Sequence, residues 1–192
     1  MRVALLFSTA LAVFTIIGGS TLKQSQAIQL QDGTIYFAHP PRLLKTTTTY
    51  NDVSVWGATY YFTVSLPEDA GEPLQKITIN QREGVDYIRF DLENSFAFEG
   101  TGSDKKQRLE LKDATSDQKT QTVSLTFDPP VSPGQIITIA LKPWQNPRYE
   151  GVYLFGLTAF PAGEKSHGQF LGFGRLHFYS HSVNYFPFPY GW

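Results

Sequence analysis

The chain has 192 residues with 16 basic and 17 acidic side chains, a formal net charge of −1 and no cysteine. Because charges of both signs are scattered along the chain, it lacks the basic stripe that binds nucleic acid, and we expect no nucleic-acid partner. The absence of cysteine excludes disulfides, so stability must come from side-chain packing, for which 15 Phe, 10 Tyr and 3 Trp supply the material.

The first 27 residues have the layout of a secretory signal peptide. Arg2 precedes an uncharged run at 3–22, and Ser25-Gln26-Ala27 fits a small-x-small cleavage site. We expect a mature chain that starts at Ile28 and is exported to the periplasm, the cell envelope or the outside of the cell. The alternative is an uncleaved anchor, since a membrane-spanning helix needs roughly 20 apolar residues. A natural protein that keeps Met1 would favour that alternative.

Residues 28–182 contain short apolar runs that alternate with polar positions and are separated by glycine, proline and aspartate, a pattern typical of an all-β domain. The first predicted strand, at 34–38, ends at His39-Pro40-Pro41. The run at 53–66 is the best candidate for a central strand, because one of its faces is almost wholly apolar. The residues on that face are Trp56, Ala58, Tyr60, Phe62, Val64 and Leu66.

The middle of the chain predicts short strands at 74–80 and 87–90, followed by a region at 104–119 that carries most of the charge. The alternation inside this charged region indicates an exposed or edge strand, and we expect a solvated hairpin there. The segment 128–134 holds three prolines and therefore has few amide donors, so we expect a turn that ends the preceding strand.

Three later runs complete the predicted domain. The run at 135–142 is apolar in part on both faces, which suggests a strand covered on two sides, and the run at 151–161 is hydrophobic enough to be central. A last strand is predicted at 170–179. About nine strands at this spacing favour a single antiparallel two-sheet β-sandwich. Residues 183–192 then form an aromatic and proline-rich C-terminal arm.

Four motifs along the chain carry a family resemblance. They are Phe37-Ala38-His39-Pro40-Pro41-Arg42-Leu43, Asp128-Pro129-Pro130-Val131-Ser132-Pro133-Gly134, Gly151-Val152-Tyr153-Leu154-Phe155-Gly156-Leu157-Thr158-Ala159-Phe160-Pro161-Ala162-Gly163 and Gly174-Arg175-Leu176-His177-Phe178-Tyr179. Together they resemble an uncharacterised family of exported cyanobacterial proteins, domain-of-unknown-function family 2808. The resemblance extends from Tyr36 to Tyr179 and implies export and a single domain, but it implies no activity, ligand or catalytic residue.

Histidines and carboxylates offer weak candidates for chemistry. His177 and His181 lie about 13 Å apart on an extended strand, too far for joint metal binding, and His167 is a third ligand only if the chain turns. Asp91 and Glu93 are the one local carboxylate pair that a secreted hydrolase of envelope polysaccharide could use as acid and base. We keep that hydrolase as an alternative function, and predict no catalytic residue, no metal residue and no cofactor.

Aromatic side chains are the remaining candidates for a contact surface. We name Trp144, Tyr149, Tyr190 and Trp192 as this surface and expect Trp56 in the core. The leading hypothesis is an exported, non-catalytic module that binds or scaffolds an envelope protein or polysaccharide. A membrane contact is expected only if residues 3–22 are retained as an anchor, in which case the protein would be a subunit of an envelope assembly.

Overall fold

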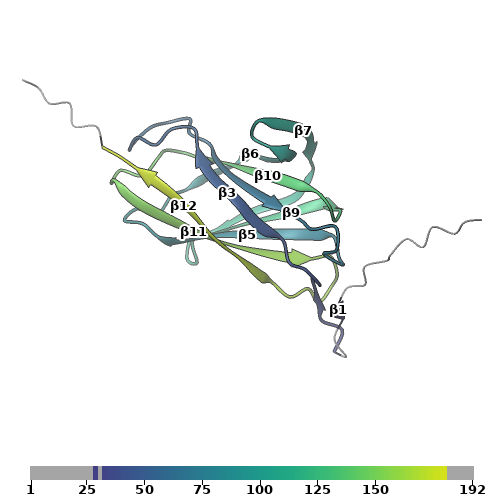
Figure 1. The fold of residues 1–192 in the computed structure, drawn as a ribbon. Coiled ribbons are helices and arrows are strands. Elements are labelled where there is room, and N and C mark those ends of the chain that lie inside the picture. Colours follow the sequence, from purple (N-terminus) through teal and green to yellow (C-terminus); the bar gives the residue numbers. More distant parts are fainter. Residues whose placement is uncertain (1–27, 30–31, 181–192) are drawn as a thin grey trace, which may run out of the picture.

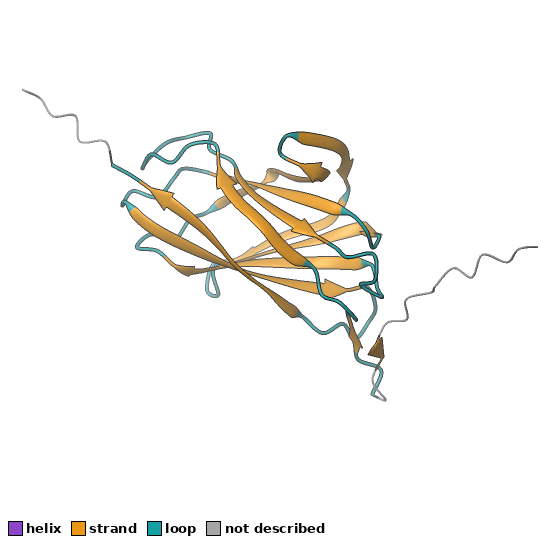
Figure 2. Ribbon diagram, viewed as in Figure 1, coloured by secondary structure: helices purple, strands orange, loops and turns teal. Residues whose placement is uncertain are grey.

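The computed structural model describes residues 28–29 and 32–180, which form an all-β fold of two five-stranded antiparallel sheets (Figures 1 and 2). The first sheet contains, in spatial order, β3 (Arg42–Thr48), β4 (Tyr60–Ser65), β10 (Ile136–Pro143), β6 (Phe90–Thr101) and β7 (Asp104–Leu109). The second contains β12 (Gln169–Phe178), β11 (Gly151–Pro161), β5 (Leu74–Glu83), β9 (Thr122–Val131) and β8 (Leu111–Asp117). A small separate pair joins β1 (Ile28–Gln29) to β2 (Ile35–Tyr36).

The predicted two-sheet β-sandwich is therefore confirmed, with ten strands in the two large sheets where about nine were expected. No helix within the described ranges is long and apolar enough to cross a membrane. The expected domain boundaries, after residues 27 and 182, fall on residues outside the described ranges.

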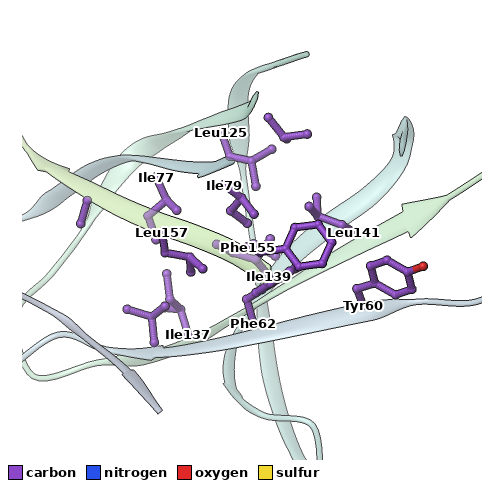
Figure 3. Close-up of a cluster of buried hydrophobic side chains, with 14 of the residues drawn as sticks. Tyr60, Phe62, Ile77, Ile79, Leu125, Ile137, Ile139, Leu141, Phe155 and Leu157 are labelled. Atoms are coloured by element: carbon purple, nitrogen blue, oxygen red, sulfur yellow. The ribbon is translucent and has the colours of Figure 1, made fainter. Parts of the chain in front are cut away.

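The core fills the space between the two sheets (Figure 3). Strand β4 supplies Tyr60, Phe62 and Val64, each fully buried, from alternate positions, because successive side chains of a strand point to opposite faces. The ring of Phe62 packs edge-on against Phe155 of β11, with 5.7 Å between the ring centroids. Contacts of this kind across the gap hold the two sheets together.

Strand β10 is covered on both faces, as its sequence predicts. Ile137 and Ile139 point into the core, while Thr138 on the outer face is also fully buried. The outer cover comes from the β6–β7 hairpin, which curls over this sheet (Figure 1). The Thr138 hydroxyl donates a hydrogen bond to the Gly100 carbonyl (2.8 Å), and the Lys105 ammonium lies 5.4 Å from the Phe98 ring centroid.

The charged region at 104–119 is exposed, but it is not one hairpin as expected. β7 pairs with β6 in the first sheet and β8 pairs with β9 in the second, so the chain passes from one sheet to the other near Glu110. Leu109 and Leu111 flank this crossing and both pack against the core. The alternation of polar and apolar residues at 104–119 therefore comes from two charged edge strands, one in each sheet, and not from one hairpin.

The turn expected at 128–134 begins later than the sequence suggests. β9 continues through the two prolines to Val131, which pairs with Leu74 of β5 after an irregularity in the ladder. The peptide bond between Asp128 and Pro129 is cis. Proline has no amide hydrogen to donate, so it fits a position where the ladder is interrupted.

The two ends of the sandwich carry different loops. We call the end formed by residues 49–59, 84–89, 118–121 and 144–150 the loop end. β12 also finishes there, so residues 179–180 lie at the loop end, whereas β1 and β2 lie at the opposite end (Figure 1). Surface loops on a rigid scaffold are the usual place for binding residues, which directs attention to the loop end.

Replacement of a core ring tests this packing. Phe155→Ala should lower the free energy of unfolding by about 3–5 kcal/mol, because it leaves a cavity between the sheets. Phe173→Ala is the matched control, since that ring on β12 is 57% exposed whereas Phe155 is 1% exposed. We expect the control to change stability by no more than about 0.5 kcal/mol in urea titrations. Similar losses for the two variants would contradict the assignment of Phe155 to the core.

Candidate functional site

Large aromatic side chains gather on the surface of the loop end, and each is at least 52% exposed. They come from three segments of the chain that Figure 2 shows meeting at the same end of the sandwich. A hydrophobic ring in water is unfavourable, so several of them at one place indicate a contact surface. These aromatic residues are Tyr50, Trp56, Trp144, Tyr149 and Tyr179.

Backbone hydrogen bonds join loop 49–59 to loop 144–150. The Asn146 amide donates to the Val55 carbonyl (2.8 Å), and the Ser54 amide donates to the Pro147 carbonyl (2.9 Å). Ser54 has a φ of 59°, a conformation that costs a non-glycine residue on the order of 1 kcal/mol and that these bonds maintain. The two exposed tryptophans are therefore carried on adjacent segments with a defined geometry.

The side-chain amide of Asn146 connects these loops to the core. Asn146 is only 2% exposed, and its Oδ1 accepts a hydrogen bond from the Tyr60 hydroxyl at 2.9 Å. Its Nδ2 donates to the carbonyls of Asp52 (2.8 Å) and Tyr50 (3.1 Å). Burial, together with the nearby Tyr153, raises the pKa of Tyr60 far above its ordinary range, so its hydroxyl stays a donor.

A second anchor holds loop 144–150 to loop 84–89. The Asp86 carboxylate accepts a hydrogen bond from the Arg148 backbone amide at 2.7 Å, and the Arg148 guanidinium lies 3.3 Å from the other oxygen. Burial acts to raise the pKa of Asp86, but the hydrogen bonds and the charge of Arg148 outweigh it and hold the pKa below its ordinary value. Asp86 is therefore ionised and paired at neutral pH.

The hydroxyl of Tyr153 forms hydrogen bonds with both loop 144–150 and loop 84–89. It donates to the Tyr149 carbonyl (3.1 Å) and accepts from the Asp86 amide (3.4 Å), while its ring is fully buried. Gly84 has a φ of +133°, and a methyl group there would lie 2.2 Å from the Tyr153 ring. Only glycine fits this close approach, so the position of loop 84–89 depends on it.

Between these two loops lies a cavity of about 410 Å³, formed by residues 86–89 and 144–148. The ladder of β6 and β10 continues past their ends, since the Trp144 amide donates to the Arg89 carbonyl at 3.0 Å. Arg89 and Trp144 are thus joined through their backbones, and both line the cavity. The cavity wall thus offers a large ring, a guanidinium and the side-chain amide of Gln145.

The predicted surface residues fall into two groups. Trp144 (57% exposed) and Tyr149 (54% exposed) both lie on loop 144–150 at the loop end. Tyr190 and Trp192 lie outside the described residues, as does the rest of the predicted C-terminal arm at 183–192. The structure therefore brings two of the four together on one loop.

The expectation that Trp56 lies in the core is wrong, because this side chain is 68% exposed. Alternation along the predicted strand at 53–66 suggested burial, but β4 starts only at Tyr60, and Trp56 belongs to the loop before it. Outside a strand, the alternation of faces no longer applies. Trp56 thereby joins the aromatic surface of the loop end.

The carboxylate pair named from the sequence, Asp91 and Glu93, lies on β6. The Asp91 carboxylate accepts hydrogen bonds from the amide and side chain of Asn94, within an irregular part of the β6–β10 ladder. Glu93 lines a different groove near β7 and β8, which does not include Asp91. A hydrolase of this kind needs two carboxyl groups that face one sugar ring, whereas these two have different surroundings.

The histidines named as weak metal candidates lie apart from one another. His177 is exposed on β12, and the ring of His167 packs against Tyr36 at 4.6 Å between centroids. His181 lies outside the described residues. Within the ranges that the structure covers, no three His, Asp or Glu side chains are grouped to hold a metal ion.

Removal of the Asn146 side chain tests the link between core and loops. Asn146→Ala should lower the free energy of unfolding by about 1–3 kcal/mol or more, because it leaves the buried Tyr60 hydroxyl without a partner. The cost should be smaller in a Tyr60→Phe background, where no hydroxyl is left unpaired. Urea titrations of the four proteins of this cycle measure the difference. Equal costs in both backgrounds would contradict the contact.

The pair of Asp86 and Arg148 predicts a dependence of stability on pH. A carboxyl whose folded-state pKa is below its ordinary value of 3.8 stabilises the fold above that pH and loses its contribution as the pH falls through the folded-state pKa. Wild type should therefore exceed Asp86→Asn in unfolding free energy at about pH 7, and the difference should shrink as the pH is lowered below 3.8. A difference that is unchanged at low pH would refute the pairing.

No curated protein matches this sequence. Solved structures that match at low similarity include the following three, each over 72% of this chain. The collagen-binding domain of a Staphylococcus aureus adhesin has 10% identity, 98% coverage of its own chain and a TM-score of 0.35. The C-terminal domain of a Streptococcus pyogenes antigen I/II-family protein has 13% identity, 47% coverage and a TM-score of 0.38. The cohesin module of a Clostridium perfringens family 33 glycoside hydrolase has 12% identity, 97% coverage and a TM-score of 0.33.

The clearest relationship is to a protein family. Its model matches residues 34–178, from just before β2 to the last residue of β12, and so covers both sheets and the loop end. This match spans more than half of the chain, and the protein therefore belongs to the family described as "Protein of unknown function (DUF2808)".

Proposed function

We propose that the protein is an exported, non-catalytic binding module that contacts a component of the cell envelope through its loop end. The observation that carries this proposal is the set of exposed rings whose loops are fastened to the core by the buried Asn146 amide. Export is supported by the signal-like layout of residues 1–27.

Three properties of the loop end favour binding. Trp, Tyr and Arg are the residue types enriched at the centres of interfaces, and all three are exposed here. The hydrogen bonds and the ion pair between the loops fix their positions before any partner arrives, which reduces the entropy that binding must overcome. The cavity of about 410 Å³ falls in the size range of ligand sites.

The same geometry argues against hydrolysis at this place. Asp86 is the only carboxylate in the segments 86–89 and 144–148 that form the cavity, and it is paired with Arg148. Hydrolysis of a glycosidic bond by the usual route needs two carboxyl groups that face one sugar ring. Binding without chemical change is the activity that these residues support.

A binding assay with isolated envelopes of the source organism tests the proposal. The variant with Trp56, Trp144 and Tyr149 all replaced by alanine should reduce the bound fraction about tenfold, because it removes the exposed rings of the loop end. The matched control replaces Leu44, Phe170 and Phe173, which are equally exposed but lie on β3 and β12. We expect that control to bind as wild type does. Full binding by the loop-end variant would refute the proposal.

A further inference from the structure

We infer that the cavity at the loop end binds an acidic polysaccharide, with Trp144 stacked on a sugar ring and Arg89 paired with a carboxylate of the polymer. This inference rests on the proposed function and adds the chemical class of the ligand. Its basis is that a ring and a cation line the same cavity, where the two other charged groups of the lining, Asp86 and Arg148, pair with each other.

The geometry of the wall comes from the backbone. Phe90 of β6 pairs with Pro143 of β10, and the next hydrogen bond joins Arg89 to Trp144. Both residues line the cavity, and this bond holds their backbones side by side. A ligand that touches the Trp144 ring therefore lies within reach of the Arg89 guanidinium.

The charges around the cavity leave Arg89 available. The guanidinium of Arg148 is paired with Asp86, whereas the described residues contain no ion-pair partner for Arg89. Glu150, on the same loop, already accepts hydrogen bonds from the hydroxyl (2.8 Å) and the amide (3.2 Å) of Ser180. The cavity lining thus carries one unpaired positive charge, that of Arg89, which can pair with one carboxylate of a ligand.

A sugar ring satisfies the remaining features of the wall better than a peptide does. The face of an indole is negative and attracts the C–H groups that one side of a pyranose presents. The Gln145 Nε2 donates to the Ser54 carbonyl (2.9 Å), which orients the amide and leaves its oxygen to accept from a hydroxyl. Tyr149 and Trp56 are also exposed at the loop end, so an extended polymer has further rings to contact there.

Three polymers separate the contributions of charge and ring. Polygalacturonate carries both sugar rings and carboxylates, dextran carries sugar rings without charge, and polyglutamate carries carboxylates without sugar. The secreted protein should bind polygalacturonate about tenfold more tightly than either of the others in about 0.1 M salt. The advantage over dextran should diminish in about 1 M salt, where charges are screened within about 3 Å.

Single variants assign the two contributions. Arg89→Gln should remove the preference for polygalacturonate and leave the affinity for dextran unchanged. Trp144→Ala should weaken binding of both sugar polymers about tenfold. Arg175→Gln is the matched control, because this exposed arginine lies on β12 outside the cavity, and it should behave as wild type.

Several results would overturn the inference. Equal affinity for polyglutamate and polygalacturonate would indicate an acidic protein partner, and equal affinity for dextran would remove the role of Arg89. If no polymer binds but envelope binding still depends on Trp144, the ligand is not an acidic polysaccharide. The proposal of a binding module then stands. If envelope binding is also independent of the loop-end rings, the proposed function fails as well.

Discussion

One buried amide determines what the loop end presents. Asn146 contacts the core through the Tyr60 hydroxyl and contacts loop 49–59 through the carbonyls of Tyr50 and Asp52. Tyr60 itself packs against Phe178 and Phe90, with ring centroids 5.6 and 5.8 Å away. The positions of the exposed aromatic residues therefore follow from the packing of the sandwich, and an amide that lost these partners in a buried place would be costly. The hydrogen bonds of Asn146 therefore hold loops 49–59 and 144–150 in a fixed position on the core.

The sandwich supplies this rigidity, and several of its edges and one outer face are covered or charged. β12 lies beside β3, where Gly174 lets Thr46 approach so closely that a methyl group would meet its hydroxyl oxygen at 2.4 Å. The edge strands β7 and β8 are rich in exposed charged residues, which discourage pairing with other chains. The β6–β7 hairpin covers the outer face of β10. The loop end differs from the rest of the described surface in combining exposed Trp and Tyr rings with an unpaired guanidinium at one cavity.

The sequence predicts the architecture well because, in a regular strand, the alternation of apolar and polar residues indicates which side chains are buried. It identified the core face of β4 from Tyr60 to Leu66, the double coverage of β10 and the internal position of β11. It failed where the backbone leaves the strand: Trp56 precedes β4, and the charged segment at 104–119 changes sheets near Glu110. The cavity could not be predicted at all, because Arg89, Asn146 and Asp86 show no pattern in sequence. They meet only through the register of β6 with β10 and the return of three loops to one end.

Native-state hydrogen exchange of the loop amides tests the central claim most directly. If the loops are fastened to the core, the amides of Ser54, Val53 and Asn146, which donate to Pro147, Tyr179 and Val55, should exchange only through openings that approach global unfolding in free energy. These three amides should then exchange as slowly as the amides of β4 and β10. Rapid exchange of these three amides, at the rate of an exposed loop, would show that the aromatic surface is not held by the fold and would contradict the account.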